Sequence, residues 1–497
     1  MTNLFSTVNE ALWGIPGVII LLGVGLYLSV RLGAVQLLLP RAFQLLLRKL
    51  RSKPDAGVSP VQALCTALAA TVGTGNLVGV AGAICLGGPG AVFWIWICGL
   101  LGMATKYTEA ALAVRFRKKG KDGYLAGPMY MMTEGLGERF RPLACVYALF
   151  GVIASFGVGC AAQINSAVTG INSMIVRFGG TPGRRFDLLI GLILAAVLAV
   201  LFCGGAKRIG QAAQLLVPVA AAGYILMCAA ILLLHAKAVP DAIASIFRGA
   251  FSPKAVTGGM IGSAFQTLRV GCSRGVFTNE VGMGTASIAH GGAEGVHPAQ
   301  QGMLGLLEVF LDTIVICTFT ALAILVSGVP IDYGVDAGAA LTSNAFCAVL
   351  GDWASAAVGI ALVLFAGATV LGWGLYGARC LEFLCGSGSW KWFVLFQFFV
   401  IIISAVADTG PVWQFSETVN ALMAFPNLLA LVLLSAEAAR ITKEYKKSGG
   451  ATASGGNYAD FHQCKPLRTV SYEKVPPSGY GSQERGQKNL SSEHRSA

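Results

Sequence analysis

About eleven apolar stretches, most of them long enough to cross a bilayer, dominate this chain of 497 residues. A helix needs about 20 largely apolar residues to cross the hydrocarbon core of a membrane. Hydrophobic residues make up 55% of the sequence and charged residues only 12%, which is typical of a multispanning membrane protein. We therefore expect an all-α integral membrane protein. The predicted spans are 11–31, 61–86, 90–114, 142–174, 186–203, 210–234, 254–284, 299–327, 353–385, 390–407 and 414–440.

The distribution of basic residues predicts the orientation of the chain. The net charge of +12 does not indicate nucleic-acid binding, because Lys and Arg lie in short loops and form no basic stripe with aromatic residues. Most of these loops fall on one side of the membrane, which the positive-inside rule assigns to the cytoplasm. We expect a cell-membrane protein with its N-terminus outside and its C-terminus cytoplasmic. The basic loops are 41–53, 115–141, 207–208, 379–391 and 440–447.

The number of spans predicts an inverted repeat. If the first span is peripheral, the other ten form two sets of five, and an odd number makes the second set enter from the opposite face. The predicted segments are an extra N-terminal helix with a cytoplasmic amphipathic linker (1–56), a first repeat (57–234), an extracellular connector (235–253), a second repeat (254–440) and a disordered cytoplasmic tail (441–497).

The second span contains residues that disfavour a continuous helix. Three glycines, two threonines and an asparagine lie at 71–79, near the centre of 61–86. Backbone leaves the helix at membrane depth only where it is buried in protein or lines a cavity. We predict a broken helix that binds a small ligand. The alternative is a helix-packing face, because Gly75 and Gly79 form a small-xxx-small pair.

A broken helix offers unpaired backbone groups of both signs. N–H groups at a helix start attract anions, and carbonyl groups at a helix end attract cations. The N–H groups of Thr74, Gly75 and Asn76 are therefore candidates to hold a carboxylate, and the carbonyls of Ala69 and Val72 to hold a small cation. This pattern suits a small zwitterion with an accompanying ion.

The repeat predicts a matching break at the start of the second half. We place it at 258–263, with Gly259, Gly262 and Ser263 as candidate site residues. Corresponding glycine-interrupted segments in two halves indicate a transporter's binding site. A second possible break lies at 269–271.

Other polar residues within the spans are candidates for the same site. Gln163 either faces the ligand or forms an interhelical hydrogen bond. Thr369 and Trp373 are four residues apart and share a helix face. Thr369 is a candidate cation ligand, although a threonine in a membrane helix often bonds its own i−4 carbonyl. Trp373 either walls the pocket or packs in the core.

Buried carboxylates are expensive in a membrane and are usually functional or paired. Glu308 and Asp312 share a face of one span, and Arg269 and Arg274 are their candidate partners. Glu109 lies near the predicted cytoplasmic end of the third span, where a gate and an ordinary interfacial charge both fit.

A set of motifs resembles the alanine or glycine:cation symporter family from about residue 10 to 440. The resemblance implies a LeuT-type fold with an extra helix and sodium-coupled uptake of small neutral amino acids. The motifs are GTGN (73–76), GGPGAVFW (87–94), GMATK (102–106) followed by Glu109, GPMY (127–130), RGVFTNE (274–280), GMG (282–284), IAH (288–290) and DT (312–313).

The resemblance also implies roles for individual residues. The implied sodium ligands are Ala69, Val72 and Thr369. At 368–369 the family typically has two adjacent hydroxyl residues, whereas this chain has Ala368 before Thr369. Both sodium and proton coupling therefore stay open. The implied substrate contacts are Thr74, Gly75, Asn76, Gln163, the 259–263 segment and Trp373.

Other classes of function fit less well. A channel needs a continuous polar pore, whereas the polar residues cluster at one depth. No HExxH or phosphate-loop motif indicates an enzyme or a cofactor. An amino-acid sensor remains an alternative. The expected partners are a small neutral amino acid, a sodium ion and membrane lipid, with no nucleic acid and no obligatory protein partner; alanine, glycine and serine all remain candidate substrates.

Overall fold

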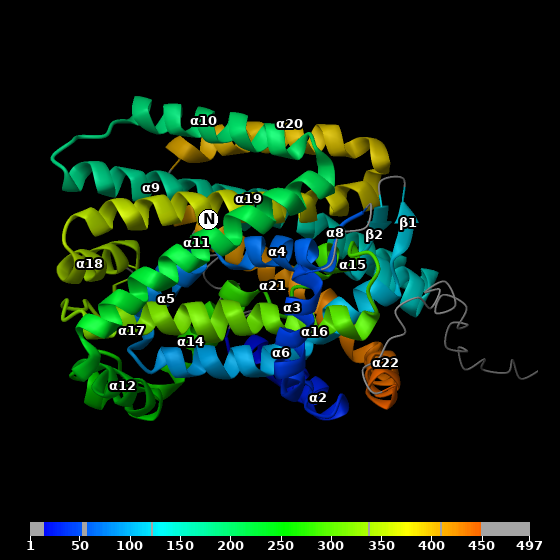
Figure 1. Ribbon diagram of the computed structural model, residues 1–497, viewed down its shortest axis with the longest axis horizontal. Helices are drawn as coiled ribbons and strands as arrows, with labels where there is room; N and C mark the ends of the chain where they lie inside the picture. Colours follow the sequence, from blue (N-terminus) through cyan, green and yellow to red (C-terminus); the bar gives the residue numbers. More distant parts are fainter. Residues whose placement is uncertain (1–13, 52–56, 121–122, 336–337, 408–409, 449–497) are drawn as a thin grey trace, which may run out of the picture. The chain divides into compact units, whose positions relative to one another are not determined.

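The computed structural model describes residues 14–51, 57–120, 123–335, 338–407 and 410–448, which all belong to one compact unit. The predicted segments before residue 14 and after residue 448 lie outside the described residues. The described part consists mainly of long helices that run side by side (Figure 1). One small antiparallel hairpin pairs Lys118 with Leu125.

The bounds of the elements are as follows. Up to residue 234 they are α2 (Ile15–Arg31), η1 (Val35–Leu38), α3 (Leu39–Leu50), α4 (Pro60–Thr71), η2 (Gly75–Gly79), α5 (Val80–Gly87), α6 (Ala91–Arg115), β1 (Lys118–Gly120), β2 (Gly123–Leu125), α7 (Pro128–Tyr130), η3 (Met131–Leu136), η4 (Glu138–Phe140), α8 (Arg141–Phe156), η5 (Gly157–Ala161), α9 (Ala162–Arg177), α10 (Arg184–Phe202) and α11 (Gly205–Leu234). The later elements are η6 (Ala236–Ala238), α12 (Val239–Phe251), α13 (Pro253–Val256), α14 (Ala264–Asn279), α15 (Thr285–Gly291), α16 (Pro298–Val309), η7 (Phe310–Cys317), α17 (Thr318–Val326), α18 (Gly338–Leu350), α19 (Trp353–Cys385), η8 (Ser387–Ser389), α20 (Trp390–Val406), α21 (Gly410–Leu433) and α22 (Ser435–Lys447).

Seven helices in the described part are long and apolar enough to cross a membrane, and the number rises to ten if each bent pair is one span. The predicted spans 90–114, 353–385 and 390–407 agree with α6, α19 and α20 to within one residue. The multispanning all-α class is therefore confirmed. The count of eleven and the five-plus-five repeat stay predictions.

α19 lies at the centre of the helix packing, where it contacts α4, α8, α9 and α11. Its large side chains Phe365, Trp373 and Tyr376 are almost completely buried. In contrast, α10 and α20 lie side by side at the top of Figure 1 and expose apolar residues such as Ile193 and Phe396. Exposed apolar faces of this kind suit contact with lipid.

The structure adds a helix to one predicted segment and moves the boundary of another. Residues 235–253, predicted as a connector, contain the helix α12. The predicted start of the tail at 441 is wrong, because α22 continues to Lys447. α22 keeps an apolar face, with Ile441 and Tyr445 buried one turn apart, and this packing extends the helix.

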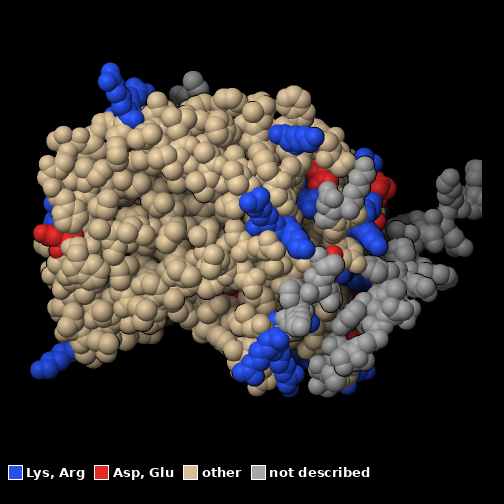
Figure 2. All heavy atoms as spheres, turned by 45° about the horizontal axis from the view of Figure 1, so that its top comes forward, with Lys and Arg blue, Asp and Glu red and all other residues tan. Residues whose placement is uncertain are grey.

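Lys and Arg gather toward the end of the helices that carries β1, β2 and α22 (Figures 1 and 2). Fewer basic side chains are visible at the opposite end (Figure 2). This asymmetry is the pattern that the positive-inside rule relates to the cytoplasmic face. The orientation itself stays a prediction.

Candidate functional site

The first interruption lies where the sequence predicts it. α4 ends at Thr71, and its axis makes an angle of 48° with the segment that begins at Gly75. Val72 is extended, with φ −76° and ψ 90°, so its carbonyl leaves the helical pattern. The broken helix is therefore confirmed. Gly75 also faces α14, since a Cβ there would lie 3.6 Å from Thr278, and so the break and helix packing coexist.

The Asn76 side chain closes the first interruption. Its Oδ1 accepts a hydrogen bond from the Gly73 N–H at 2.9 Å. Its Nδ2 donates to the carboxylate of Asp312 at 2.8 Å and to the Asp312 carbonyl at 3.2 Å. The amide is therefore used to tie the break to η7. This is a structural role that the sequence did not indicate.

Three of the predicted site residues meet at this break. The Thr74 hydroxyl donates to Gln163 Oε1 on α9 at 2.9 Å. A Cβ on Gly73 would lie 2.6 Å from the Thr369 hydroxyl and 3.5 Å from Gln163 Oε1. The structure therefore brings residues from α9 and α19 against the bare backbone of the first interruption.

Thr369 supplies a polar group that the protein leaves available. Its hydroxyl oxygen is buried and has no hydrogen-bond partner among the described residues, so the bond to its own i−4 carbonyl is absent. α19 packs tightly on the end of α4 here, because a Cβ on Gly372 would lie 2.8 Å from that of Ala70. Buried polar atoms normally have partners, so an unpaired one requires an explanation, such as a bound ion or water. The Thr369 hydroxyl and the backbone carbonyls at the end of α4 are hard neutral oxygens, a ligand type that suits an alkali cation.

Trp373 on α19 contacts both η5 and the second interruption. Its ring lies directly against Gly159 of η5, where a side chain would collide with it. Its indole N–H donates to Glu280 Oε1 at 2.6 Å. Trp373 is therefore a wall between helices and also a link to the second interruption.

The second interruption lies at 280–284, between α14 and α15. Glu280, Gly282 and Gly284 have φ values of 52°, 84° and 76°, and this left-handed backbone ends the helix. Glycine at two of the three positions removes most of the steric penalty. The GMG motif at 282–284 is the sequence signal for this break, although the glycine pair at 258–259 gives an equally strong one.

The predicted break at 258–263 is wrong. Gly259 and Gly262 have open space where a side chain would project, and exposed Ser263 caps α14 by accepting from the Phe265 N–H at 3.2 Å. These residues form a surface turn before the helix, and the structure does not bring them to the site. The alternative break at 269–271 is also wrong, because α14 is continuous there.

The buried carboxylates have partners other than the predicted arginines. Glu308 pairs with Lys106 at 3.2 Å and with His290 at 2.9 Å, and all three side chains are buried. Asp312 accepts from Asn76 and Thr313. The predicted pairing with Arg269 and Arg274 is therefore wrong. The actual partner, Lys106 on α6, is too far away in the sequence to be recognised from it.

Glu109 is fully buried, so the interpretation as an interfacial charge is wrong. Its Oε1 accepts from the Gly284 N–H at 3.1 Å and from Asn427 Nδ2 at 2.7 Å. Asn427 also donates to the Gly282 carbonyl at 2.9 Å. Glu109 and Asn427 therefore hold the backbone of the second interruption.

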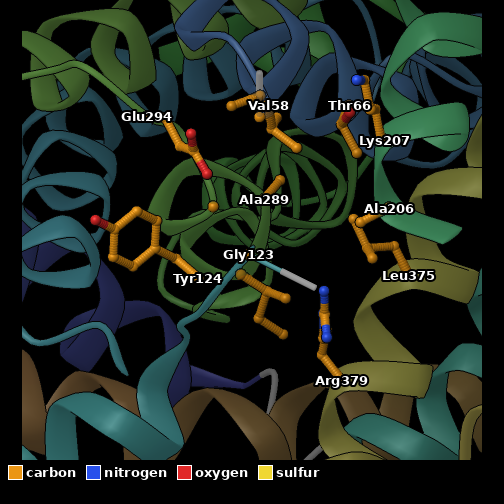
Figure 3. A pocket seen from close by; sticks show the side chains of 14 residues that line it. Val58, Thr66, Gly123, Tyr124, Ala206, Lys207, Ala289, Glu294, Leu375 and Arg379 are labelled. Carbon is orange, nitrogen blue, oxygen red and sulfur yellow. The ribbon is translucent and has the colours of Figure 1, made fainter. Parts of the chain in front are cut away.

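A cavity of about 310 Å³ lies between the start of α4, α15, the β1–β2 hairpin and α19 (Figure 3). Thr66 lines it one turn before the end of α4, and Leu375 lines it two residues after Trp373. Lys207 and Arg379 lie on one side of the cavity, and Glu294 and Tyr124 on the other (Figure 3). The cavity therefore lies on the side of the basic loops, and residues of the first interruption do not line it.

α19 contacts one half of each interrupted helix, α4 and α15, and the fold as a whole is similar to that of a LeuT-type transporter. The crystal structure of MhsT in complex with L-phenylalanine shares this fold, with a TM-score of 0.57 and 13% identity, over 82% of this chain and 96% of MhsT.

Sequence similarity identifies the family. Residues 1–456 match the sodium:alanine symporter family, and the chain belongs to this family. It is 40% identical over 452 residues to the sodium/alanine symporter AgcS of Methanococcus maripaludis, covering 90% of this chain and 97% of AgcS. It is 41% identical over 449 residues to an uncharacterized transporter of Haemophilus influenzae, covering 89% and 96%. The predicted family and its transporter class are confirmed, and the protein is not an enzyme.

Proposed function

We propose that this protein is a sodium-coupled symporter that imports small neutral amino acids, alanine or glycine, by alternating access. The observation that carries the proposal is the unpaired hydroxyl of Thr369 beside the first interruption, a hydroxyl without a partner among the described residues. The name of its relative AgcS, a sodium/alanine symporter, supports the same coupling ion and substrate.

The substrate carboxylate would bind to the N–H groups at the start of η2, at Thr74 and Gly75. The third candidate, the Asn76 N–H, donates to the Gly73 carbonyl at 3.3 Å and is therefore excluded from this role. Gln163 and Trp373 would form the walls.

Sodium would bind to the Thr369 hydroxyl and to the carbonyls of Ala69 and Val72. Occupancy there stabilises the bent form of the first interruption, and the substrate binds to that same form. The two ligands therefore favour each other, and the effect is reciprocal. We infer that the cavity beside α15 is the cytoplasmic exit and that the two interrupted helices are equivalent members of an inverted repeat.

Uptake by the purified protein tests the proposal. In proteoliposomes with an inward sodium gradient, labelled alanine is expected to accumulate above its external concentration. Dissipating the gradient should abolish the accumulation. Alanine binding without uptake would identify a sensor, and accumulation that follows a proton gradient in sodium-free buffer would identify proton coupling. Either result would contradict sodium symport.

Thr369→Ala is expected to raise the sodium concentration for half-maximal uptake by roughly tenfold to a hundredfold. A lost contact to a charged partner is worth roughly 1.5–3 kcal/mol, and 1.4 kcal/mol is a factor of ten. The alanine concentration for half-maximal uptake, measured at saturating sodium, should change much less. Thr369→Ser keeps the hydroxyl and serves as the matched control. Equal effects on sodium and alanine would place Thr369 outside the cation site.

Ala368→Ser tests the missing hydroxyl of the cation site. The family typically has hydroxyls at both positions, and Ala368 is buried beside Thr369. If sodium binds here, the added hydroxyl is expected to lower the sodium requirement several-fold, as sodium titration of alanine uptake would show. An unchanged sodium requirement, with normal expression, would argue against this location.

A further inference from the structure

Four carboxylates and one lysine are buried together between the two interruptions. Glu109, Glu280, Glu308 and Asp312 are at most 3% exposed, and Lys106 is fully buried. Lys106 lies within electrostatic reach of Glu109, Glu280 and Glu308, and Asp312 lies within reach of Glu308. We call these four acidic residues the carboxylate cluster. Its negative charges outnumber the one lysine.

One positive charge on Lys106 and at most one on His290 cannot balance four carboxylates. His290 Nε2 lies 2.9 Å from Glu308 Oε2, and His290 Nδ1 lies 2.6 Å from Gln301 Nε2. Buried ions without a counter-charge cost several kcal/mol each, so the cluster requires at least one bound proton or cation.

The hydrogen bonds indicate which carboxyl group carries the proton. Both oxygens of Glu280 accept hydrogen bonds, from Trp373 and from Thr285 at 2.6 Å. Both oxygens of Glu308 and of Asp312 are likewise bonded. Donors to both oxygens favour the ionised form. Glu109 differs, because its Oε2 is buried and has no partner among the described residues.

Two further polar groups near Glu109 also lack partners among the described residues. The Tyr376 hydroxyl on α19 is buried within electrostatic reach of Glu109 and Glu280. Thr105 Oγ1 is buried one turn before Glu109, on the same face of α6. In the described part of the chain, no three His, Cys, Asp or Glu residues are arranged to hold a metal ion. A proton needs only one oxygen, so it fits this arrangement.

We propose that Glu109 is a proton-binding site, separate from the cation site at Thr369, and that its carboxyl group is protonated in this conformation. This proposal deepens the proposed function. Its consequence for transport rests on that function, whereas proton binding by Glu109 does not. Glu109 holds the backbone of 282–284 through Gly284 and Asn427. Deprotonation adds a buried charge at this point, so proton release is linked to rearrangement of the second interruption.

Polar and titratable groups from several elements surround Glu109. They are Thr105 and Lys106 on α6, Tyr147 on α8, Glu280 and Gly284 in the second interruption, Glu308 on α16 with its partner His290 on α15, Tyr376 on α19 and Asn427 on α21.

Infrared spectroscopy of the purified full-length protein in detergent tests proton occupancy with hydrogen ions as the probe. Near neutral pH the wild type should show a carboxylic-acid C=O stretch that shifts in D₂O, and Glu109→Gln should lose one carboxyl equivalent of it. Glu280→Gln is the matched buried control and should retain the band. An equal band in wild type and Glu109→Gln would overturn the proposal. This measurement needs neither alanine nor sodium, so it is independent of the proposed function.

Asn427→Ala keeps Glu109 and tests the same site if Glu109→Gln does not fold. Asn427 donates to Glu109 Oε1, and removing a donor favours the protonated form. The pH at which half of the Glu109 carboxylic-acid band is lost should therefore rise by about one unit. An unchanged or lower midpoint would overturn the proposal. If Glu109 is the site, the pH dependence of alanine uptake should also be lost in Glu109→Gln.

Discussion

Replacing Gly73 with alanine is expected to lower sodium-dependent alanine uptake by roughly tenfold or more. The new Cβ would lie 2.6 Å from the Thr369 hydroxyl and 3.5 Å from Gln163 Oε1. Overpacking of a tight buried site costs about 1–3 kcal/mol, and here the displaced group is the proposed cation ligand. Uptake into proteoliposomes as a function of sodium would measure the loss.

Gly75→Ala is the matched control, because it adds the same methyl group two residues later. Its nearest contact would be Thr278 at 3.6 Å, which is an ordinary van der Waals distance. Uptake should therefore stay within a few-fold of wild type. Gly75→Leu is much larger and would press against Thr278 and Phe277 of α14, so it should abolish transport without preventing membrane insertion. Normal uptake by Gly73→Ala, or greater damage from Gly75→Ala, would contradict the site.

Lys106→Met is expected to destabilise the protein by about 3–5 kcal/mol, because it leaves the Glu308 carboxylate buried without its cation. Thermal unfolding of the purified protein in detergent would show a large fall in the midpoint. Lys106→Arg keeps the charge but is bulkier in a closely packed place, where Gly305 approaches the Lys106 side chain. It should have an intermediate effect.

A double variant separates charge from packing. Lys106→Met combined with Glu308→Gln removes both charges and should recover much of the lost stability, since a buried pair removed as a unit costs less than a broken one. The coupling between the two changes measures the interaction. No recovery in the double variant would show that Lys106 acts mainly through packing.

The first interruption could be predicted because its signal is local. A cluster of glycine and polar residues inside an apolar span disfavours a continuous helix whatever the rest of the chain does, and Gly73, Thr74 and Thr369 meet there in the structure. The predicted second interruption lies about 20 residues before the observed one. Gly258 and Gly259 carry the same local signal, but they occupy a surface turn with positive φ.

Pairing between distant helices could not be predicted from one sequence. Lys106 meets Glu308 across 202 positions, and Asn76 meets Asp312 across 236. Spacing along one helix shows which residues share a face, but it does not show which neighbouring helix that face contacts. Glu308 and Asp312 are therefore recognisable as unusual from the sequence, whereas their partners are not.

The hydrogen bonds of Asn76 make the bend between α4 and η2 rigid. Its amide joins Gly73 on one side of the bend to Asp312 on a neighbouring helix. Straightening or sharpening that bend would break buried bonds worth about 1–3 kcal/mol each. We therefore expect α4, η2 and α5 to move as one rigid bent unit in a conformational change, with the backbone flexing outside these three elements.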